Sequence, residues 1–291
     1  MELLSAGNSF NQNGFTELKM NKLVKLFLPA FLLHLARVAR EARYRSKQTY
    51  SGVYSSFDEV PKRGDGYEDD QWPAVAAQYA RWAITKNESG FIPSVVTNEN
   101  ALLPLLVATT RATRILDFGG AAGFSYIATK YGSMHEVERY VVVEHPKVCA
   151  QGRVIFKGDP RVEFMESIPK EQFDLVVIGS ALQYVSDYKE MLKTLASLKP
   201  RWFLFTKLPA GENLTFVTAQ INLPGKTLSS WLFNAKELIF AMDRLDYKVV
   251  FRCANEGQVN QGEIESRYKL GQFGNLLFEA TSFLGDGSHG S

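Results

Sequence analysis

Cysteine and histidine are both scarce in this chain of 291 residues, which has two cysteines and four histidines. A disulfide framework or a structural zinc site needs more cysteines, or histidines at ligand spacing, and the sequence supplies no such set. Cys149 and Cys253 each lie at or near the edge of an apolar run. This placement predicts free thiols in a reducing compartment. We therefore expect a cytoplasmic protein without a metal site, although a metal requirement of the reaction stays open.

A long uninterrupted hydrophobic run is also missing. The most apolar stretch, Leu23–Ala39, is broken by Lys25, Pro29, His34 and Arg37. It is too short and too interrupted for a transmembrane span. Arginines follow it instead of a small-residue cleavage site, so a secretory signal is not expected. Met20 is an alternative start, and residues 1–19 are polar and expected to be disordered.

Basic charge is concentrated in one N-terminal arm. The segment from Lys19 to Lys47 contains eight basic residues and one acidic residue, a net charge of +7. Because the whole chain has a net charge of +2, the rest of the chain has a net charge of −5. The overall charge gives no argument for nucleic acid, and an anionic partner should meet this arm first. Apolar residues recur at helical spacing in it, namely Leu23, Phe27, Phe31 and Leu35. Residues 20–46 are therefore expected either to lie on an anionic membrane surface or to pack against the domain or a second subunit. The oligomeric state stays open.

The chain divides into three predicted segments: residues 1–48 with the arm, a cap at 49–112, and a domain at 113–284. The cap begins with a Gly- and Ser-rich stretch, 51–66, which indicates a loop. Two helices are predicted after it, Trp72–Lys86 capped by Asp70 and Glu99–Arg111 with a kink or later start at Pro104.

Strands and helices alternate in the third segment, which is typical of a parallel α/β sheet. The predicted strands are Arg114–Phe118, Tyr140–Val143, Val162–Phe164, Phe173–Ile178, Trp202–Thr206, Tyr247–Arg252 and Phe273–Glu279. The predicted helices are Ala122–Tyr131, Pro146–Phe156, Asp187–Leu198 and Lys236–Leu245. Seven strands in this order predict a Rossmann-like, doubly wound, mostly parallel sheet with helices on both faces.

The most specific motif is Asp117-Phe118-Gly119-Gly120-Ala121-Ala122-Gly123, between a predicted strand and a predicted helix. Its glycines do not fit the G-x-G-x-x-G spacing that places a dinucleotide pyrophosphate on the helix N-terminus. A carboxylate at Asp117 would also repel phosphates. It would attract S-adenosylmethionine, which has no phosphate and carries an ammonium and a sulfonium. The alternative is a strand–turn–helix corner without a ligand.

These residues resemble the acid-x-G-x-G-x-G loop of class I S-adenosylmethionine-dependent methyltransferases. Asp117, Gly119 and Gly123 match, Ala121 replaces the middle glycine, and Gly120 can restore flexibility. Glu144 ends the next strand 21 residues after Gly123. That spacing predicts an acid that binds the ribose hydroxyls of the cofactor.

Further residues follow the strands at the same predicted edge. The resemblance implies that Glu166 and Ser167 contact the adenine, the alternative being a surface loop. It also places Ser180, Leu182 and Gln183, from the stretch GSALQYV, at the cofactor. His145 is either a wall of the cofactor pocket or a catalytic base.

Acceptor-binding residues are less defined. Tyr184 is expected to orient the acceptor or hold the sulfonium, the alternative being packing. Lys207 is expected to meet an anionic acceptor, and Tyr54 to stack on a sugar ring, although both have surface or core alternatives. An N-P-P-Y sequence, typical of amino-methylating enzymes, is absent after the fourth strand, which favours a hydroxyl acceptor.

Several blocks together are similar to a family of methyltransferases encoded in bacterial polysaccharide and O-antigen clusters. They are Tyr50–Tyr54, the loop at Asp117, GSALQY, the stretch from Thr206 to Gln220, Trp231, Asp246-Tyr247 and the arm, within residues 22–252. The resemblance implies O-methylation of a glycan, sugar nucleotide or glycolipid precursor. The rivals are a catalytically silent Rossmann scaffold in polysaccharide assembly and an NAD-dependent oxidoreductase.

Overall fold

The computed structural model describes residues 48–64, 71–87, 92–98, 100–222 and 225–284. The arm, including the predicted membrane-contacting segment 20–46, and the predicted helix cap Asp70 lie outside the described residues. No helix within the described ranges is long and apolar enough to cross a membrane.

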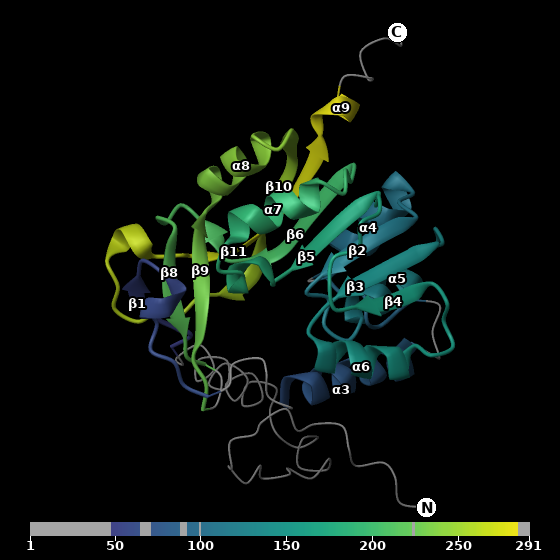
Figure 1. Ribbon diagram of the computed structural model, residues 1–291, viewed down its shortest axis with the longest axis horizontal. Helices are drawn as coiled ribbons and strands as arrows, with labels where there is room; N and C mark the ends of the chain where they lie inside the picture. Colours follow the sequence, from purple (N-terminus) through teal and green to yellow (C-terminus); the bar gives the residue numbers. More distant parts are fainter. Residues whose placement is uncertain (1–47, 65–70, 88–91, 99, 223–224, 285–291) are drawn as a thin grey trace, which may run out of the picture. The chain divides into compact units, whose positions relative to one another are not determined.

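A seven-stranded sheet forms the centre of the described chain, in the order β10-β11-β6-β5-β2-β3-β4 (Figure 1). Its strands are β2 (Arg114–Phe118), β3 (Arg139–Val143), β4 (Val162–Met165), β5 (Leu175–Gly179), β6 (Trp202–Leu208), β10 (Tyr247–Gln258) and β11 (Gln272–Ala280). The strands β2 to β6 are parallel to one another, whereas β11 runs antiparallel to both neighbours. The Rossmann-like, mostly parallel sheet is therefore confirmed.

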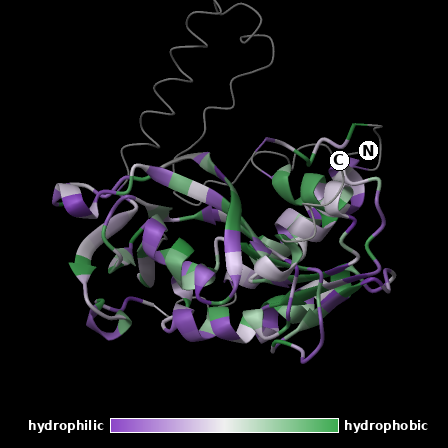
Figure 2. Cartoon of the chain, turned by 90° about the horizontal axis from the view of Figure 1, so that it is seen from above, coloured by the Kyte–Doolittle hydropathy of each residue, from purple (hydrophilic) through white to green (hydrophobic). Residues whose placement is uncertain are grey.

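Helices cover both faces of this sheet. The helices are α3 (Gln71–Asn87), α4 (Leu102–Thr110), α5 (Phe124–Gly132), α6 (Pro146–Ile155), α7 (Tyr188–Ala196), α8 (Ala235–Asp243) and α9 (Thr281–Leu284). Buried residues of α3 to α6 pack in one hydrophobic cluster and those of α7 and α8 in another, on the opposite face. Figure 2 shows strands in which green predominates and several helices that carry both green and purple residues. This mixture is the amphipathic pattern of helices packed on a sheet, whereas α4 (LLPLLVATT) has no charged residue.

The helix ends largely follow the predicted signals. The Asp187 side chain accepts a hydrogen bond from the Glu190 backbone and caps α7, and Pro146 begins α6. The helix predicted from Glu99 starts later, at Leu102, so that Pro104 falls in its first turn. Proline is tolerated there because the first-turn N–H groups have no partner within the helix.

A second, four-stranded sheet was not predicted. This small sheet has the order β1-β8-β9-β7, formed by β1 (Tyr50–Tyr54), β8 (Phe216–Gln220), β9 (Leu228–Asn234) and β7 (Ala210–Gly211). The prediction of a loop throughout 51–66 is therefore wrong at its start, because β1 pairs with β8 despite its glycine and serines. The three-segment division stays a prediction. However, β1 of the predicted cap shares a sheet with strands of the predicted domain.

Candidate functional site

The Gly-rich loop between β2 and α5 has a conformation that requires glycine. Gly119 has φ +72°, and Gly123, the N-cap of α5, has φ +87°. A Cβ on Gly119 would lie 2.3 Å from the Cβ of Ala181, which belongs to the loop after β5. The Gly119 N–H donates to the Val143 carbonyl at the end of β3. The loop therefore joins the carboxyl ends of three neighbouring strands, and only glycine fits at position 119.

Backbone strain marks the same edge of the sheet. Three non-glycine residues with positive φ occur at or near the carboxyl ends of parallel strands: Ala121 after β2, Ser180 after β5 and Lys207 near the end of β6. The other three, Arg111, Lys199 and Asp246, closely follow helices, where a left-handed residue is ordinary. Such strain costs about 1–3 kcal/mol at each position and gathers at functional sites. This edge is therefore the candidate site.

Glu144 lies directly beside the Gly-rich loop. Its carboxylate accepts a 2.7 Å hydrogen bond from the backbone N–H of His145, and the backbone N–H of Ala121 in the loop also favours its charged form. Burial raises the pKa of Glu144, and these two N–H groups act in the opposite direction. A carboxylate has about four acceptor positions, so it keeps capacity for hydroxyl donors. The structure thus brings the predicted ribose acid and the loop together.

Asp117 lies behind the loop and is fully buried. Its Oδ2 accepts a 2.8 Å hydrogen bond from the Tyr140 hydroxyl, and the Ser125 hydroxyl also favours the charged carboxylate. Its Oδ1 has no partner among the residues that the structure describes. A Cβ on Gly120 would lie 2.4 Å from Oδ2, so the loop passes closely over the carboxylate. Burial raises the pKa of Asp117 to about 7.

Tyr140 and Ser125 were missed as site residues. Tyr140 was counted only as part of an apolar strand. The strand register pairs it with Ile115, two residues before Asp117 and on the same face. That period-two relation is the signal that could have identified it.

The pKa of Asp117 makes stability depend on pH. Unfolded aspartate titrates near 3.9, so the unfolded chain loses this proton at lower pH than the folded chain. The contribution of Asp117 to the free energy of unfolding is therefore expected to fall as the pH rises from about 4 to about 7. Asp117→Asn cannot titrate, so its stability relative to wild type should rise by roughly 2–3 kcal/mol between pH 4.5 and 7.5. Urea unfolding of both proteins across this range measures the difference, and a constant difference would contradict the assignment.

The residues after β5 turn mostly inward. Gln183 is 1% exposed, and its Nε2 donates to the carbonyl and the hydroxyl of Ser180 at 3.0 and 2.9 Å. Its Oε1 has no partner within the described part of the chain. Leu182 is wholly buried in the core beneath α7 and α8. Leu182 therefore has no exposed surface with which its side chain could contact a cofactor, because the short 3-10 helix Leu182–Tyr184 directs this side chain into the core.

The residues after β3 and β4 differ in exposure. His145 is the N-cap residue of α6 and half-buried, and its Nδ1 is buried without a partner. Glu166 forms a 3.4 Å ion pair with Arg153, both about half exposed, and Ser167 is exposed. A pocket-wall role for His145 and an adenine contact for Glu166 and Ser167 stay predictions.

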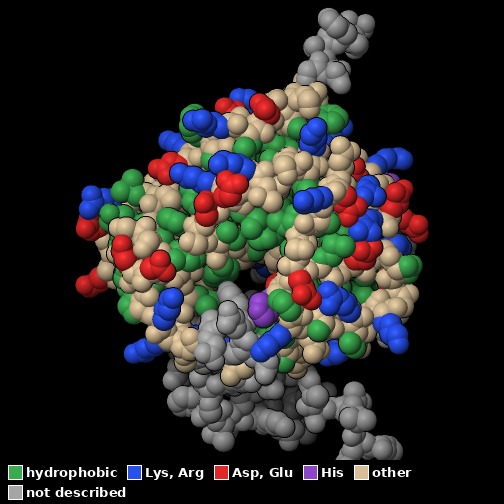
Figure 3. Space-filling view, in the orientation of Figure 1, with side chains coloured by type: hydrophobic (Ala, Val, Ile, Leu, Met, Phe, Trp, Pro, Cys, Tyr) green, Lys and Arg blue, Asp and Glu red, His purple; other side chains and the backbone are tan. Residues whose placement is uncertain are grey.

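Tyr184 connects this edge to the small sheet. Its hydroxyl donates to the Gln220 Oε1 of β8 at 2.7 Å, and the indole of Trp231 in β9 donates to the Val185 carbonyl at 3.1 Å. Tyr54 packs in the small sheet against its neighbours. The Lys207 N–H donates to the Asn275 Oδ1 within a bulge between β6 and β11. The small sheet therefore lies beside the carboxyl edge of the central sheet. Figure 3 shows a hollow between the small sheet and α6 on the face of the molecule that is in view.

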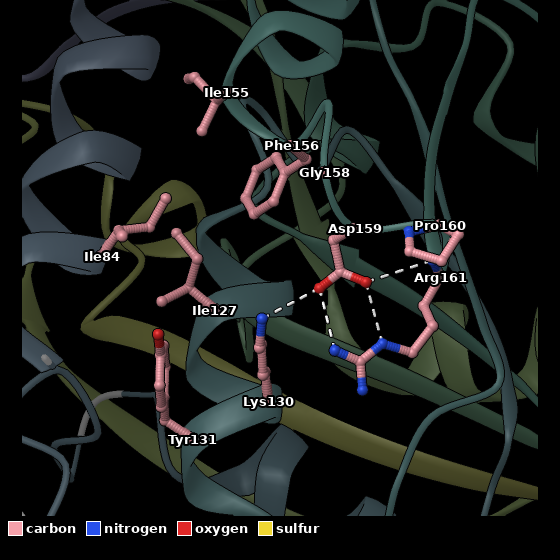
Figure 4. A pocket seen from close by; sticks show the side chains of 10 residues that line it. All are labelled: Ile84, Ile127, Lys130, Tyr131, Ile155, Phe156, Gly158, Asp159, Pro160 and Arg161. Carbon is pink, nitrogen blue, oxygen red and sulfur yellow. Dashed lines mark hydrogen bonds and ion pairs between the residues drawn. The ribbon is translucent and has the colours of Figure 1, made fainter.

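A separate cavity of about 480 Å³ lies elsewhere, between α3, α5, α6 and the segment before β4 (Figure 4). Apolar side chains line one side, and Asp159 on the other binds Lys130 and Arg161 at 3.0 and 2.9 Å. These partners hold the pKa of Asp159 well below its usual range. The charges are already paired, and the cavity is at the amino end of β4. It is therefore a weaker candidate, and the described residues contain no cluster of three metal-ligating side chains.

No family model and no curated protein sequence matches the chain. Solved structures with a similar backbone include 1,6-didemethyltoxoflavin-N1-methyltransferase from Burkholderia thailandensis, 15% identical over 79% of this chain and 100% of that chain, with a TM-score of 0.45. The CcbJ methyltransferase from Streptomyces caelestis is 14% identical over 68% of this chain and 95% of that chain, with a TM-score of 0.44. Magnesium protoporphyrin IX methyltransferase from Synechocystis is 12% identical over 72% and 97%, with a TM-score of 0.45. At these values the likenesses carry no argument about activity, which must be inferred from the site.

Proposed function

We propose that this chain is an S-adenosylmethionine-dependent methyltransferase that binds its cofactor at the carboxyl edge of β2, β3 and β5. The observation that carries the proposal is the meeting of the Gly-rich loop with the end of β3, where the Gly119 N–H donates to the carbonyl of Val143, directly before Glu144. In open α/β sheets, ligands bind outside the carboxyl ends of the strands. An acid there suits the ribose hydroxyls of a nucleoside.

The residues present fit this cofactor. Asp117 Oδ1, at the end of β2, and Gln183 Oε1, in the 3-10 helix after β5, are buried acceptors without a donor among the described residues. They lie beside the two loops that touch at Gly119 and Ala181. Buried acceptors without partners are unusual and are satisfied by a ligand or by water. The ammonium of the methionine moiety offers three N–H donors. When bound, the cofactor supplies a methyl group on a sulfonium that leaves readily to a nucleophile.

The chain's own contribution is binding and alignment. Glu144 is suited to hold the ribose, and the loops after β2 and β5 to hold the methionine end. The small sheet, tied to the loop after β5 by Tyr184 and Trp231, is placed to exclude water and to position the acceptor. Aligning an acceptor oxygen behind the methyl carbon in a dry site supplies much of the acceleration of such a reaction.

The sheet itself argues against an NAD-dependent oxidoreductase. The dinucleotide fold has six strands in the order 3-2-1-4-5-6. Here β11, reversed, is inserted between β6 and β10. The G-x-G-x-x-G spacing is also absent, and a carboxylate at Asp117 lies behind the loop where a pyrophosphate would sit.

The acceptor is proposed to be a hydroxyl of a glycan, sugar nucleotide or glycolipid precursor. The resemblance to polysaccharide-cluster methyltransferases and the absence of N-P-P-Y support it, and Lys207 near the end of β6 suits an anionic acceptor. A catalytically silent scaffold is the alternative, and only turnover distinguishes it.

Titration calorimetry with S-adenosylmethionine, S-adenosylhomocysteine and NAD tests cofactor binding. Saturable binding of both adenosyl ligands, and not of NAD, is expected. Binding of NAD alone would overturn the proposal. Incubation with labelled S-adenosylmethionine and a panel of sugar nucleotides then tests turnover, and cofactor binding without incorporation into any acceptor of the class would favour the scaffold.

The arm, residues 20–46, is proposed to hold the enzyme at the cytoplasmic membrane face near a lipid-linked acceptor. Each basic residue near an anionic surface contributes about 1 kcal/mol, an effect that salt screens. We expect the full chain to sediment with anionic vesicles at low salt, and not with neutral vesicles or at high salt. Deleting residues 1–46 should abolish the binding. If the full chain does not sediment with anionic vesicles at low salt, the arm does not have this role.

A further inference from the structure

The proposed cofactor and its product differ by one unit of charge. In the transfer, the S–CH₃ bond breaks and its electron pair stays on sulfur. The acceptor oxygen forms the new bond to carbon, and the hydroxyl proton is released to water. The positively charged sulfonium thereby becomes a neutral thioether, while the ammonium, carboxylate, ribose and adenine remain unchanged. A group that responds to charge alone can tell the two ligands apart.

Asp117 is placed to be such a group. Its carboxylate is fully buried, and the Gly-rich loop passes so closely over it that Gly120 has no room for a Cβ. Solvent does not screen a charge at this depth as it would at the surface. Tyr140 occupies Oδ2, whereas Oδ1 has no partner within the described part of the chain. Among the described residues, no basic side chain belongs to the groups that shift the pKa of this carboxyl group.

We propose that Asp117 is a specificity-determining residue that favours the sulfonium cofactor over its thioether product. The proposal rests on the proposed function, because it requires the cofactor to lie against the loop. Its consequence is that methyl transfer itself removes an attraction between the ligand and the enzyme. Release of the product is then easier than release of the cofactor.

The groups facing Asp117 determine how this preference varies with pH. Tyr140 of β3 donates to the carboxylate, and Ser125 of α5 also favours its charged form. Glu144 adds a like charge, and Tyr126 of α5 packs on Tyr140. His145 follows Glu144 at the same edge. Since burial raises the pKa of Asp117 to about 7, its charge is present above that pH and lost below it. The preference for the sulfonium should therefore strengthen as the pH rises through 7.

Calorimetry of wild type and Asp117→Asn with S-adenosylmethionine and S-adenosylhomocysteine, at pH 6 and pH 8, tests the proposal. In wild type, the ratio of the product's Kd to the cofactor's Kd should rise about fivefold between the two pH values, because the carboxyl group is mostly protonated at pH 6 and mostly ionised at pH 8. The full effect of the charge is about tenfold, as for unit charges roughly 12 Å apart at an effective dielectric constant of about 20. In Asp117→Asn the ratio should stay constant. Glu144→Gln is the matched control, because both ligands share the ribose. It should weaken the binding of both ligands and keep a rise in the ratio, but at a lower pH, because the like charge of Glu144 no longer raises the pKa of Asp117.

A second measurement uses wild type alone and does not depend on the variant folding. A cation near Asp117 lowers its pKa, so binding of S-adenosylmethionine near pH 7 should release more protons than binding of the product. Calorimetry in two buffers of different ionisation enthalpy counts these protons. Equal proton release for the two ligands, or the same rise in the ratio in a folded Asp117→Asn, would overturn the role of Asp117. Failure of wild type to bind either ligand would instead overturn the proposed function.

Discussion

Gly119→Val is expected to abolish binding of S-adenosylmethionine while the protein remains folded. The valine Cβ would lie 2.3 Å from the Cβ of Ala181, and a β-branched residue is a severe outlier at φ +72°. The loop after β2 must then move relative to the loop after β5. We expect at least a 100-fold loss of affinity, about 2.7 kcal/mol or more. Calorimetry measures the affinity, and circular dichroism with thermal unfolding measures the fold.

Gly225→Val is the matched control for the backbone. Gly225 has nearly the same φ, +70°, but a Cβ there meets nothing within 4 Å. It should lose about 1–2 kcal/mol of stability from the left-handed conformation and keep its affinity for the cofactor. Ala121→Gly relieves the strain at the middle of the loop and should also bind. Wild-type affinity in a folded Gly119→Val would mean that the loop is only a structural corner.

Glu144→Gln is expected to weaken the binding of both S-adenosylmethionine and S-adenosylhomocysteine by about 1.5–3 kcal/mol, the contribution of hydrogen bonds to a charged group. The amide keeps the shape of the side chain but offers one acceptor oxygen, to which the His145 N–H already donates. The ribose hydroxyls would then lose their partner. Calorimetry with both ligands gives the two changes directly.

Glu163→Gln provides the comparison for charge removal near the site. Glu163 lies on the neighbouring strand β4 and is paired with Arg139. Its removal lowers the negative charge of the region by the same amount and should leave both affinities unchanged. If Glu144→Gln binds like wild type, the carboxylate faces solvent in the complex and the ribose assignment is wrong.

The parallel core could be predicted because its signals are local. Each strand from β2 to β6 is a short apolar run followed by glycine, a polar residue or proline, and one loop carries a specific motif. The position of Glu144 next to that loop follows from the register, since Phe118 and Val143 are partners. A motif at a strand end and an acid at the next strand end therefore predict a shared edge.

The small sheet could not be predicted by the same reasoning. Its β1 contains Ser51 and Gly52, which are typical of loops, and it becomes a strand only by pairing with β8. The partners Tyr50 and Gln220 are 170 residues apart, and no local pattern records such a pairing. The inward turn of Leu182 was missed for a related reason. The 3-10 helix at this point interrupts the period on which the assignment of faces depends.

The pairing of β1 with β8 also bears on the order of events during synthesis. Residues 50–54 leave the ribosome before any strand of the parallel sheet, yet their partner strand is completed only at Gln220. Contacts of such high sequence separation form late, because the entropic cost of closing a long loop comes before the contacts can stabilise the chain. The nascent chain can therefore assemble the Gly-rich loop and Glu144 on β2 and β3 well before β1 has a partner. In the order of synthesis, the residues that we propose to hold the nucleoside precede the small sheet that we propose to position the acceptor, and β10 and β11 of the central sheet come after both.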